Sequence, residues 1–267
     1  MTARSAVIFL PNDAAKTGAG KPMMLQRILG VPLLKWLVYS LRQAGMQRCF
    51  LVSSAEFLPE AKRCFPKDVA LTCADGEQVP DQMHVFLSTA QEQEQQVLVI
   101  TAPVILIPQQ AVLCEEQPLS DAPSGAYSVL RTELMSALDE KFSFMGFLEK
   151  HGRAKTEREG FFPVSTLADL PDWQPVLKRM PLDDLTAAGV EIWDYDNCFV
   201  DPFVTVGAGT ALLPGTILQG ATRVGKDCKI GPNALLEDAE LADGVTVNAS
   251  QVYRSSIGSG TKVGPFA

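Results

Sequence analysis

The last quarter of the sequence carries an apolar residue at every sixth position, and this period constrains the fold more than any other feature of the chain. The unbroken series is Val200, Val206, Leu212, Leu218, Val224, Ile230 and Leu236. After a slip in register it continues at Leu241, Val247, Val252, Ile257 and Val263. An α-helix repeats every ~3.6 residues and a half-buried strand every ~2, so neither structure explains this spacing.

A stack of flat-sided coils does explain it, because each hexapeptide forms one face with its aliphatic side chain pointing inward. Small or β-branched residues such as Thr210 and Thr216 follow four positions after the apolar residue, and glycines such as Gly207 follow it directly. We therefore predict a left-handed parallel β-helix over residues 200–267. A connecting helix over 181–188 and an entry segment up to residue 199 precede it.

The upstream part of the chain has a different pattern. Short apolar segments bounded by turn residues predict buried strands at 6–10, 49–53, 69–72 and 97–101. Helical patterns between and after them predict helices at 32–44, 58–64, 81–92, 108–114 and 134–150, with a polar loop at 153–160. Strands that alternate with helices are typical of a parallel sheet covered on both faces. We therefore expect an α/β Rossmann-like domain over residues 1–180.

Charge and composition exclude several classes of function. The formal net charge of −8 argues against general affinity for nucleic acid or an anionic membrane surface. The chain contains no apolar stretch long enough for a membrane helix, and its first residues do not resemble a signal peptide. The six cysteines are widely spaced and only two histidines occur, so we expect no zinc site. We expect reduced thiols and a cytoplasmic protein.

Three segments of the repeat region carry a specific resemblance. Residues 224–233 (VGKDCKIGPN), 243–248 (DGVTVN) and 255–267 (SSIGSGTKVGPFA) resemble the central part of the bifunctional UDP-N-acetylglucosamine pyrophosphorylase/glucosamine-1-phosphate N-acetyltransferase family. Residues 189–194 (GVEIWD) resemble its entry into the β-helix. The N-terminal half resembles the family's nucleotidyltransferase domain more loosely. The resemblance implies a nucleotide or nucleotide-sugar ligand, Mg²⁺ wherever pyrophosphorylase activity persists, and a homotrimer through the β-helix.

The resemblance places a nucleotide-binding loop directly after the first strand. In the family this loop is glycine-rich, and its amides hold the nucleotide phosphates. Here the loop spans residues 11–22, in which Gly18, Gly20 and Lys21 have the composition of a phosphate nest. A single glycine-rich stretch is a weak motif, and an ordinary surface loop is the alternative interpretation.

Two charged positions of the family are replaced in this sequence. The family lysine that steadies the transferred phosphate corresponds to Met23, and Lys21 is the nearest substitute. The family aspartate that holds Mg²⁺ corresponds to Pro103, which has no side-chain ligand. The second metal ligand, an asparagine, has no counterpart here. We therefore assign no catalytic residue and no metal ligand.

The uracil-reading segment of the family corresponds to residues 77–84 (EQVPDQMH). Gln78 keeps an amide for a base edge, and we include it among the expected nucleotide-binding residues. His84 has no evident catalytic partner, so a half-buried helix residue is its favoured interpretation.

Three functions remain open at this point. The first is a protein of the sugar-nucleotide pyrophosphorylase type, which makes UDP-N-acetylglucosamine from UTP and N-acetylglucosamine-1-phosphate. We expect it to be inactive or impaired, because Met23 and Pro103 replace the family's lysine and aspartate. The second is a non-catalytic nucleotide-sugar-binding or oligomerisation protein. The third is a fragment of a longer bifunctional enzyme, since the coils that carry the acetyltransferase site would follow residue 267. We also expect a trimer that associates further end to end through residues 257–267.

Overall fold

The computed structural model describes residues 4–18, 20–91, 94–108, 120–139 and 143–267. The chain divides into two compact units, Met1–Pro171 and Asp172–Ala267, and each is described by itself. The helix expected at 108–114 lies almost wholly outside the described residues. Among the residues that are described, no helix is long and apolar enough to cross a membrane.

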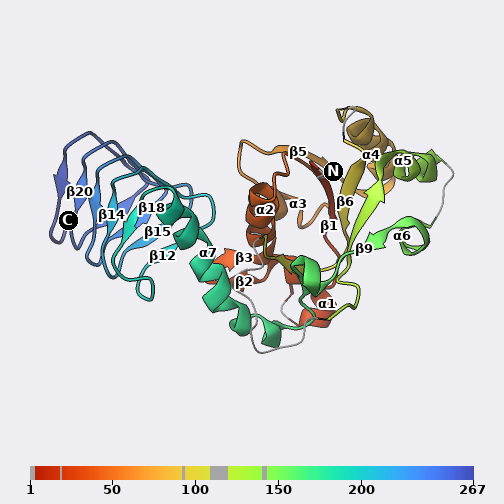
Figure 1. The fold of residues 1–267 in the computed structure, drawn as a ribbon, viewed down its shortest axis with the longest axis horizontal. Helices are drawn as coiled ribbons and strands as arrows, with labels where there is room; N and C mark the ends of the chain where they lie inside the picture. Colours follow the sequence, from red (N-terminus) through yellow and green to blue (C-terminus); the bar gives the residue numbers. More distant parts are fainter. Residues whose placement is uncertain (1–3, 19, 92–93, 109–119, 140–142) are drawn as a thin grey trace. The chain divides into compact units, whose positions relative to one another are not determined.

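A six-stranded sheet forms the centre of the first unit, with the order β5-β4-β1-β6-β8-β9 (Figure 1). Its parallel strands are β1 (Ser5–Phe9), β4 (Arg48–Val52), β5 (Ala70–Ala74) and β6 (Gln96–Ile100). The strand β8 (Ala126–Leu130) runs antiparallel to β6 and to β9 (Arg153–Ala154). The four strands predicted from the sequence are thus confirmed, and β8 adds an antiparallel neighbour that the pattern did not reveal.

Helices cover both faces of this sheet. On one face lies α2 (Leu33–Gln43), whose side chains from Leu33 to Leu41 are mostly buried. Side chains of α4 (Val79–Ser88), α5 (Arg131–Asp139) and α6 (Phe144–His151) pack with Val7, Val97 and Val99 in one apolar cluster on the other face. The short helices are α1 (Ala14–Thr17), α3 (Leu58–Lys62) and the 3₁₀ turns η1 (Met23–Leu25), η2 (Gly76–Gln78), η4 (Glu157–Glu159), η5 (Leu167–Asp169) and η6 (Pro171–Trp173).

Three details of the sequence prediction need correction. The single helix expected at 134–150 is two helices, because Ser143 caps the start of α6 by accepting the backbone N–H of Gly146. The expected polar loop at 153–160 contains β9 and η4. The connecting helix does not begin at Pro181: α7 spans Gln174–Ala187, with Pro181 inside it. Two small antiparallel strand pairs complete the first unit: the hairpin of β2 (Arg27–Ile28) with β3 (Val31–Pro32), and the pairing of β7 (Val104–Leu106) with the distant β10 (Phe161–Pro163).

The second unit is a left-handed parallel β-helix with three flat sheets, as the six-residue period predicts. The sheets are β11-β14-β17-β20-β23, β12-β15-β18-β21 and β13-β16-β19-β22. In chain order from β11 to β23, the strands are Glu191–Ile192, Phe199–Val200, Thr205–Val206, Ala211–Leu212, Ile217–Gln219, Arg223–Val224, Lys229–Ile230, Leu235–Glu237, Glu240–Leu241, Thr246–Val247, Gln251–Tyr253, Ser256–Ile257 and Lys262–Val263.

Each coil stacks its residues directly on those of the preceding coil. For example, Leu218 pairs with Leu236, and Leu236 pairs with Val252. The inward column of these residues is almost completely buried. The buried threonines between the columns keep their hydroxyls satisfied, since Thr210 donates to the Gly225 carbonyl (2.9 Å) and Thr216 to that of Leu213 (2.7 Å). Burial of the aliphatic columns and satisfaction of these hydroxyls together stabilise the stack.

Candidate functional site

The carboxyl edge of the central sheet is the natural place for a ligand site in the first unit. The chain leaves β1 toward β4 and β5 on one side and returns to β6 on the other, so β1 and β6 border the point where the strand order reverses. In open α/β sheets ligands bind outside the carboxyl ends of the strands at such a point. The loops after β1, β5 and β6 contain every nucleotide-binding residue that the sequence analysis proposed.

The loop after β1 is exposed and is closed at its base by one hydrogen bond. The Asp13 Oδ1 atom accepts the backbone N–H of Met23 at 2.9 Å. Gly18 and Gly20 both have left-handed backbones, with φ of 66° and 70°. No described atom lies within 4 Å of a Cβ built on either glycine. The backbone of this loop is therefore accessible to a ligand on the side of these two residues.

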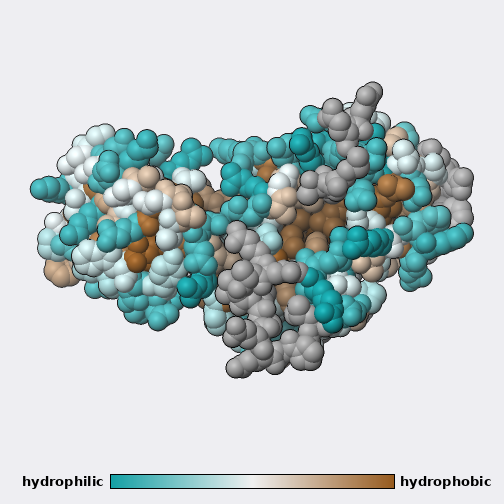
Figure 2. Space-filling model, viewed as in Figure 1, coloured by the Kyte–Doolittle hydropathy of each residue, from teal (hydrophilic) through white to brown (hydrophobic). Residues whose placement is uncertain are grey.

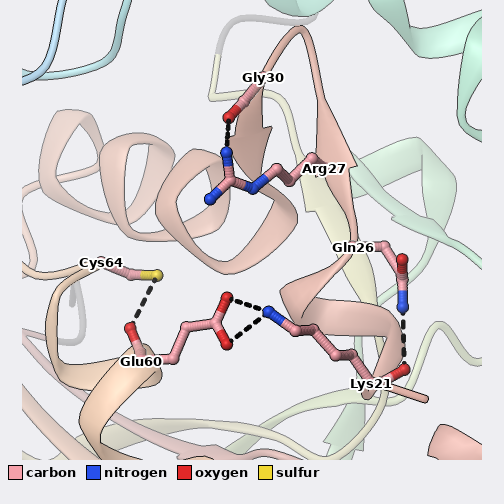
Figure 3. A network of polar contacts seen from close by, with 6 residues as sticks. All are labelled: Lys21, Gln26, Arg27, Gly30, Glu60 and Cys64. Atoms are coloured by element: carbon pink, nitrogen blue, oxygen red, sulfur yellow. Dashed lines mark hydrogen bonds and ion pairs between the residues drawn. The ribbon is translucent and has the colours of Figure 1, made fainter. Parts of the chain in front are cut away.

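Lys21 is engaged by Glu60, as Figure 3 shows. Its Nζ atom lies 2.9 and 2.8 Å from the two carboxylate oxygens, and its carbonyl accepts the Gln26 side-chain amide at 2.9 Å. Glu60 belongs to α3, which follows β4. The lysine side chain thus bridges the β1 loop to the β4 side of the sheet, whereas the reversal point lies on the β6 side.

Met23, at the position of the family lysine, is part of the core. It begins η1, and the three residues of this turn, Met23 to Leu25, are all buried, with Met23 at 2% exposure. This turn packs against α2, whose buried Trp36 donates its indole N–H to the Ile28 carbonyl. The methionine is therefore a packing residue, and a charged side chain here would require rearrangement of the turn.

The segment after β6 is closely packed against the start of β8. Thr101 donates its backbone N–H and its hydroxyl to the Gly125 carbonyl, at 2.8 and 3.0 Å. Gly125 has a φ of 84°, and a Cβ built on it would lie 2.5 Å from that of Ala102. The carbonyl of Pro103 accepts the N–H of Val164 at 3.0 Å. Within the described residues, no group of three or more His, Cys, Asp or Glu side chains is placed to hold a metal ion.

The residues expected to read the base lie at the end of β5. Gln78 is exposed at the end of η2, and its Oε1 atom accepts the Gln82 amide at 2.9 Å. His84 is half-buried in the middle of α4. The structure therefore leaves Gln78 available at the carboxyl edge, while His84 belongs to the helix layer.

Lys155 is a candidate that the sequence analysis missed. Its backbone N–H donates to the Ala126 carbonyl, and Ala126 is opposite Ile100, the last residue of β6. Lys155 thus lies at the level of the carboxyl edge, two strands from β6. Its side chain is half-buried, and its Nζ atom pairs with the Glu159 carboxylate at 2.9 Å. The spacing of four between Lys155 and Glu159 indicates an ion pair, but it does not indicate a position at the carboxyl edge. That position depends on the pairing of strands from distant segments of the chain.

The two lysines whose side chains are described at this edge are therefore each paired with a glutamate. Lys21 is bound by Glu60 and Lys155 by Glu159, which also accepts from Arg153. A triphosphate needs several uncompensated donors to offset its charge. The edge offers exposed backbone at Gly18 and Gly20 and an amide at Gln78, whereas the charges of Lys21 and Lys155 are largely neutralised.

Comparisons with known proteins identify relatives of the chain. No protein-family model matches it. It is 34% identical over 168 residues, 57% of its length, to the "Bifunctional protein GlmU" of Caldanaerobacter subterraneus subsp. tengcongensis, of which the match covers 37%. The protein of that name from Thermoanaerobacter pseudethanolicus is 43% identical over 30% of this chain and 17% of its own length. The one from Clostridioides difficile is 28% identical over 61% and 39%. The matches thus span less than half of each relative.

Two solved structures show looser likeness. The inositol-1-phosphate CTP transferase from T. maritima has a TM-score of 0.48 and 11% identity, over 67% of this chain and 97% of its own. The 4-diphosphocytidyl-2C-methyl-D-erythritol synthase from Anaerococcus prevotii has a TM-score of 0.41 and 12% identity, over 66% and 98%. At these scores neither structure has any weight in assigning a function to the chain.

Proposed function

Since the chain is a GlmU-like protein with a nucleotidyltransferase-type sheet and hexapeptide coils, we propose that it is a sugar-nucleotide pyrophosphorylase-like protein with impaired chemistry. In an active relative, a sugar phosphate would attack the α-phosphorus of UTP and release pyrophosphate with help from Mg²⁺. The proposal is that this transfer is negligible here, and that the first unit keeps at most nucleotide or nucleotide-sugar binding. We also propose a cytoplasmic location, where the six widely spaced cysteines would stay reduced.

The burial of Met23 is the observation that carries this proposal. A lysine that stabilises charge on a transferred phosphate must reach the ligand, and such electrostatic stabilisation is commonly the largest part of catalysis. The side chain at this position is instead enclosed in the core at 2% exposure. Pro103, at the position of the metal-binding aspartate, contributes only a carbonyl, which Val164 already occupies. Neither position supplies what in-line phosphoryl chemistry requires.

Incubation of the purified protein with UTP, N-acetylglucosamine-1-phosphate and Mg²⁺ tests this proposal directly. We expect no pyrophosphate release above background. A turnover of about 1 s⁻¹, within the ordinary enzyme range, would contradict it. Such a result would mean that other residues at the carboxyl edge do the work of the two missing groups.

Residual nucleotide binding is a separate part of the proposal. Gly18, Gly20, Lys21 and Gln78 are the residues assigned to it, on the support of the open backbone at the two glycines. We expect weak binding of UTP and UDP-N-acetylglucosamine that does not depend on Mg²⁺. Titration calorimetry with and without the metal is the measurement. No heat at about millimolar ligand would mean that binding is weaker than about −4 kcal/mol. The four residues would then belong to an ordinary surface and not to a binding site.

Assembly through the β-helix is the second candidate function. Strands β12, β15 and β18 direct Phe199, Ile217 and Leu235 outward in one column, opposite to the buried Val200, Leu218 and Leu236. Phe199 is 38% exposed, and the Lys178 ammonium lies 4.3 Å from its ring centre. In Figure 2 the visible face of the coils is mostly hydrophilic, with apolar side chains reaching the surface in a few places.

We propose that this column is part of the contact between copies in a homotrimer, the closed assembly expected from the family resemblance. Light scattering after size exclusion should give a mass of about three chains. Leu235→Glu should lower that mass, whereas Thr246→Glu, on another sheet, should not. The measurement uses the protein at about micromolar concentration, which is well above the Kd of a stable assembly. A monomeric wild-type protein at this concentration would contradict the trimer.

A further inference from the structure

A hollow of about 390 Å³ lies between α5 and α6. Its α5 wall presents Thr132, Glu133 and Ser136, and its α6 wall presents Phe147, Lys150 and His151. This volume is within the range of sites that hold small molecules. The hollow belongs entirely to the first unit and is lined by none of the residues assigned to nucleotide binding.

The hollow lies in the helix layer and not at the carboxyl edge. α5 begins directly after Leu130, and Leu130 is opposite Gln96, the first residue of β6. The first turns of α5 are therefore close to the amino edge of the sheet. On α6 the lining residues belong to the last two turns, which lead into β9. A ligand here would be separate from one bound by the loop after β1.

Charges of opposite sign face the hollow from opposite walls without meeting. Glu133 is in the first turn of α5, and Lys150 is in the last turn of α6, beside His151. The Glu133 and Lys150 charges each suit the dipole of their own helix. No ion pair joins Glu133 to Lys150 or His151 among the residues that the structure describes, although both walls line one cavity. The Thr132 and Ser136 hydroxyls likewise carry no hydrogen bond to described residues.

A planar surface accompanies these charges. The Phe147 ring is buried, and the His151 imidazole stacks on it with ring centres 5.0 Å apart and planes inclined by 15°. His151 is exposed, so a second ring can stack on its imidazole from the side opposite Phe147. Gly146 has no side chain to fill the space beside it.

We propose that this hollow binds a small zwitterion of the amino-acid class with a planar side chain. Its carboxylate is bound by Lys150 with the hydroxyls of Thr132 and Ser136, and its ammonium group by Glu133. Its ring stacks on His151. A zwitterion pairs with the charges of both walls at once. A simple anion would be repelled by Glu133, and a simple cation would be repelled by Lys150. This inference is independent of the function proposed for the carboxyl edge.

Titration of the ¹⁵N-labelled full chain with three isosteric probes tests the proposal. L-phenylalanine carries both charges, 3-phenylpropanoate lacks the ammonium group and 2-phenylethylamine lacks the carboxylate. We expect L-phenylalanine to shift the amide signals of Ser136 and Gly146, and to bind about tenfold more tightly than either other probe, which is about 1.4 kcal/mol. Binding at the loop after β1 would instead shift Gly18 and Gly20.

Charge-neutral variants separate the roles of the two walls. Glu133→Gln should weaken L-phenylalanine about tenfold and leave 3-phenylpropanoate unchanged, while Lys150→Gln should weaken both and leave 2-phenylethylamine unchanged. Lys67→Gln, an exposed lysine elsewhere in the unit, is the matched control and should change none of the three. The proposal is overturned by unshifted Ser136 and Gly146 signals at about 10 mM probe, or by equal affinities for the three probes.

Discussion

The ammonium group of Lys21 lies 2.8 and 2.9 Å from the two carboxylate oxygens of Glu60, a residue 39 positions further along the chain. The pair joins the loop after β1 to α3. Both side chains are partly exposed, so the ion pair itself contributes little to stability, on the order of 0–1 kcal/mol. Its main consequence is electrostatic, since Glu60 offsets the positive charge that the glycine-rich loop would offer to a phosphate.

Removal of the Glu60 charge should therefore strengthen nucleotide binding. We expect Glu60→Gln to lower the Kd of UTP by about three- to tenfold, because Lys21 is released and a repelling carboxylate is lost. The increase should shrink as salt is raised from low to physiological concentration. Titration calorimetry with UTP is the measurement.

The double variant Lys21→Gln/Glu60→Gln provides the control for that prediction. Without the lysine, the gain from Glu60→Gln should disappear. An equal gain in the single and double variants would show that Glu60 acts on the ligand by itself and that Lys21 is not a phosphate ligand.

A lysine at position 23 should damage the fold and not repair the site. Met23→Lys places an unpaired charge at a position that is 2% exposed, so we expect a loss of unfolding free energy greater than about 2 kcal/mol. Pyrophosphate release should stay at background. Met145→Lys is the matched control, because Met145 is 46% exposed and the change there should stay within about 0.5 kcal/mol. Urea unfolding of the two variants beside the parent makes the comparison, and equal stability would place Met23 outside the core.

The coils were predictable from the sequence because each hexapeptide obeys the same local rule, so the period alone specifies the inward columns. The strands of the first unit were predictable for a similar reason, as each is a short apolar segment. The candidate site was less predictable. Lys155 reaches the carboxyl edge only through the pairing of β8 with β9, and Lys21 meets Glu60 through packing of α3 near the β1 loop. Contacts of this kind depend on tertiary structure, which no local pattern encodes.

Close stacking of the coils requires a glycine directly after the apolar residue of a hexapeptide. Gly207 is at this position, and its φ is not positive. A Cβ at Gly207 would lie 2.7 Å from backbone atoms of Gly225 and Lys226 in the next coil. We therefore expect Gly207→Ala to cost about 1–3 kcal/mol of unfolding free energy. Thermal unfolding of this variant beside the parent is the measurement, and an unchanged midpoint would contradict the stacking geometry.

The buried thiols of the first unit should resist alkylation. Burial raises the pKa of Cys49 to about 12 and that of Cys64 to about 12, from an ordinary value of 9.0. Burial also raises the pKa of Cys73, which is only half-buried. The thiolate is the reactive form, so at pH 8 only about one in 10⁴ of the Cys49 and Cys64 thiols is reactive.

Iodoacetamide labelling followed by peptide mass spectrometry checks this expectation between pH 7 and 9. Cys49 and Cys64 should remain unlabelled in the folded protein and react readily after denaturation, with Cys73 reacting first among the three because it is the most accessible. The raised pKa values also make stability depend on pH. Unfolded thiols lose their protons near pH 9, whereas the folded Cys49 and Cys64 thiols hold theirs to about pH 12. The unfolding free energy should therefore fall as pH rises above 9. Rapid labelling of Cys49 at pH 8 in the folded protein would show that β4 opens to solvent on the timescale of the reaction.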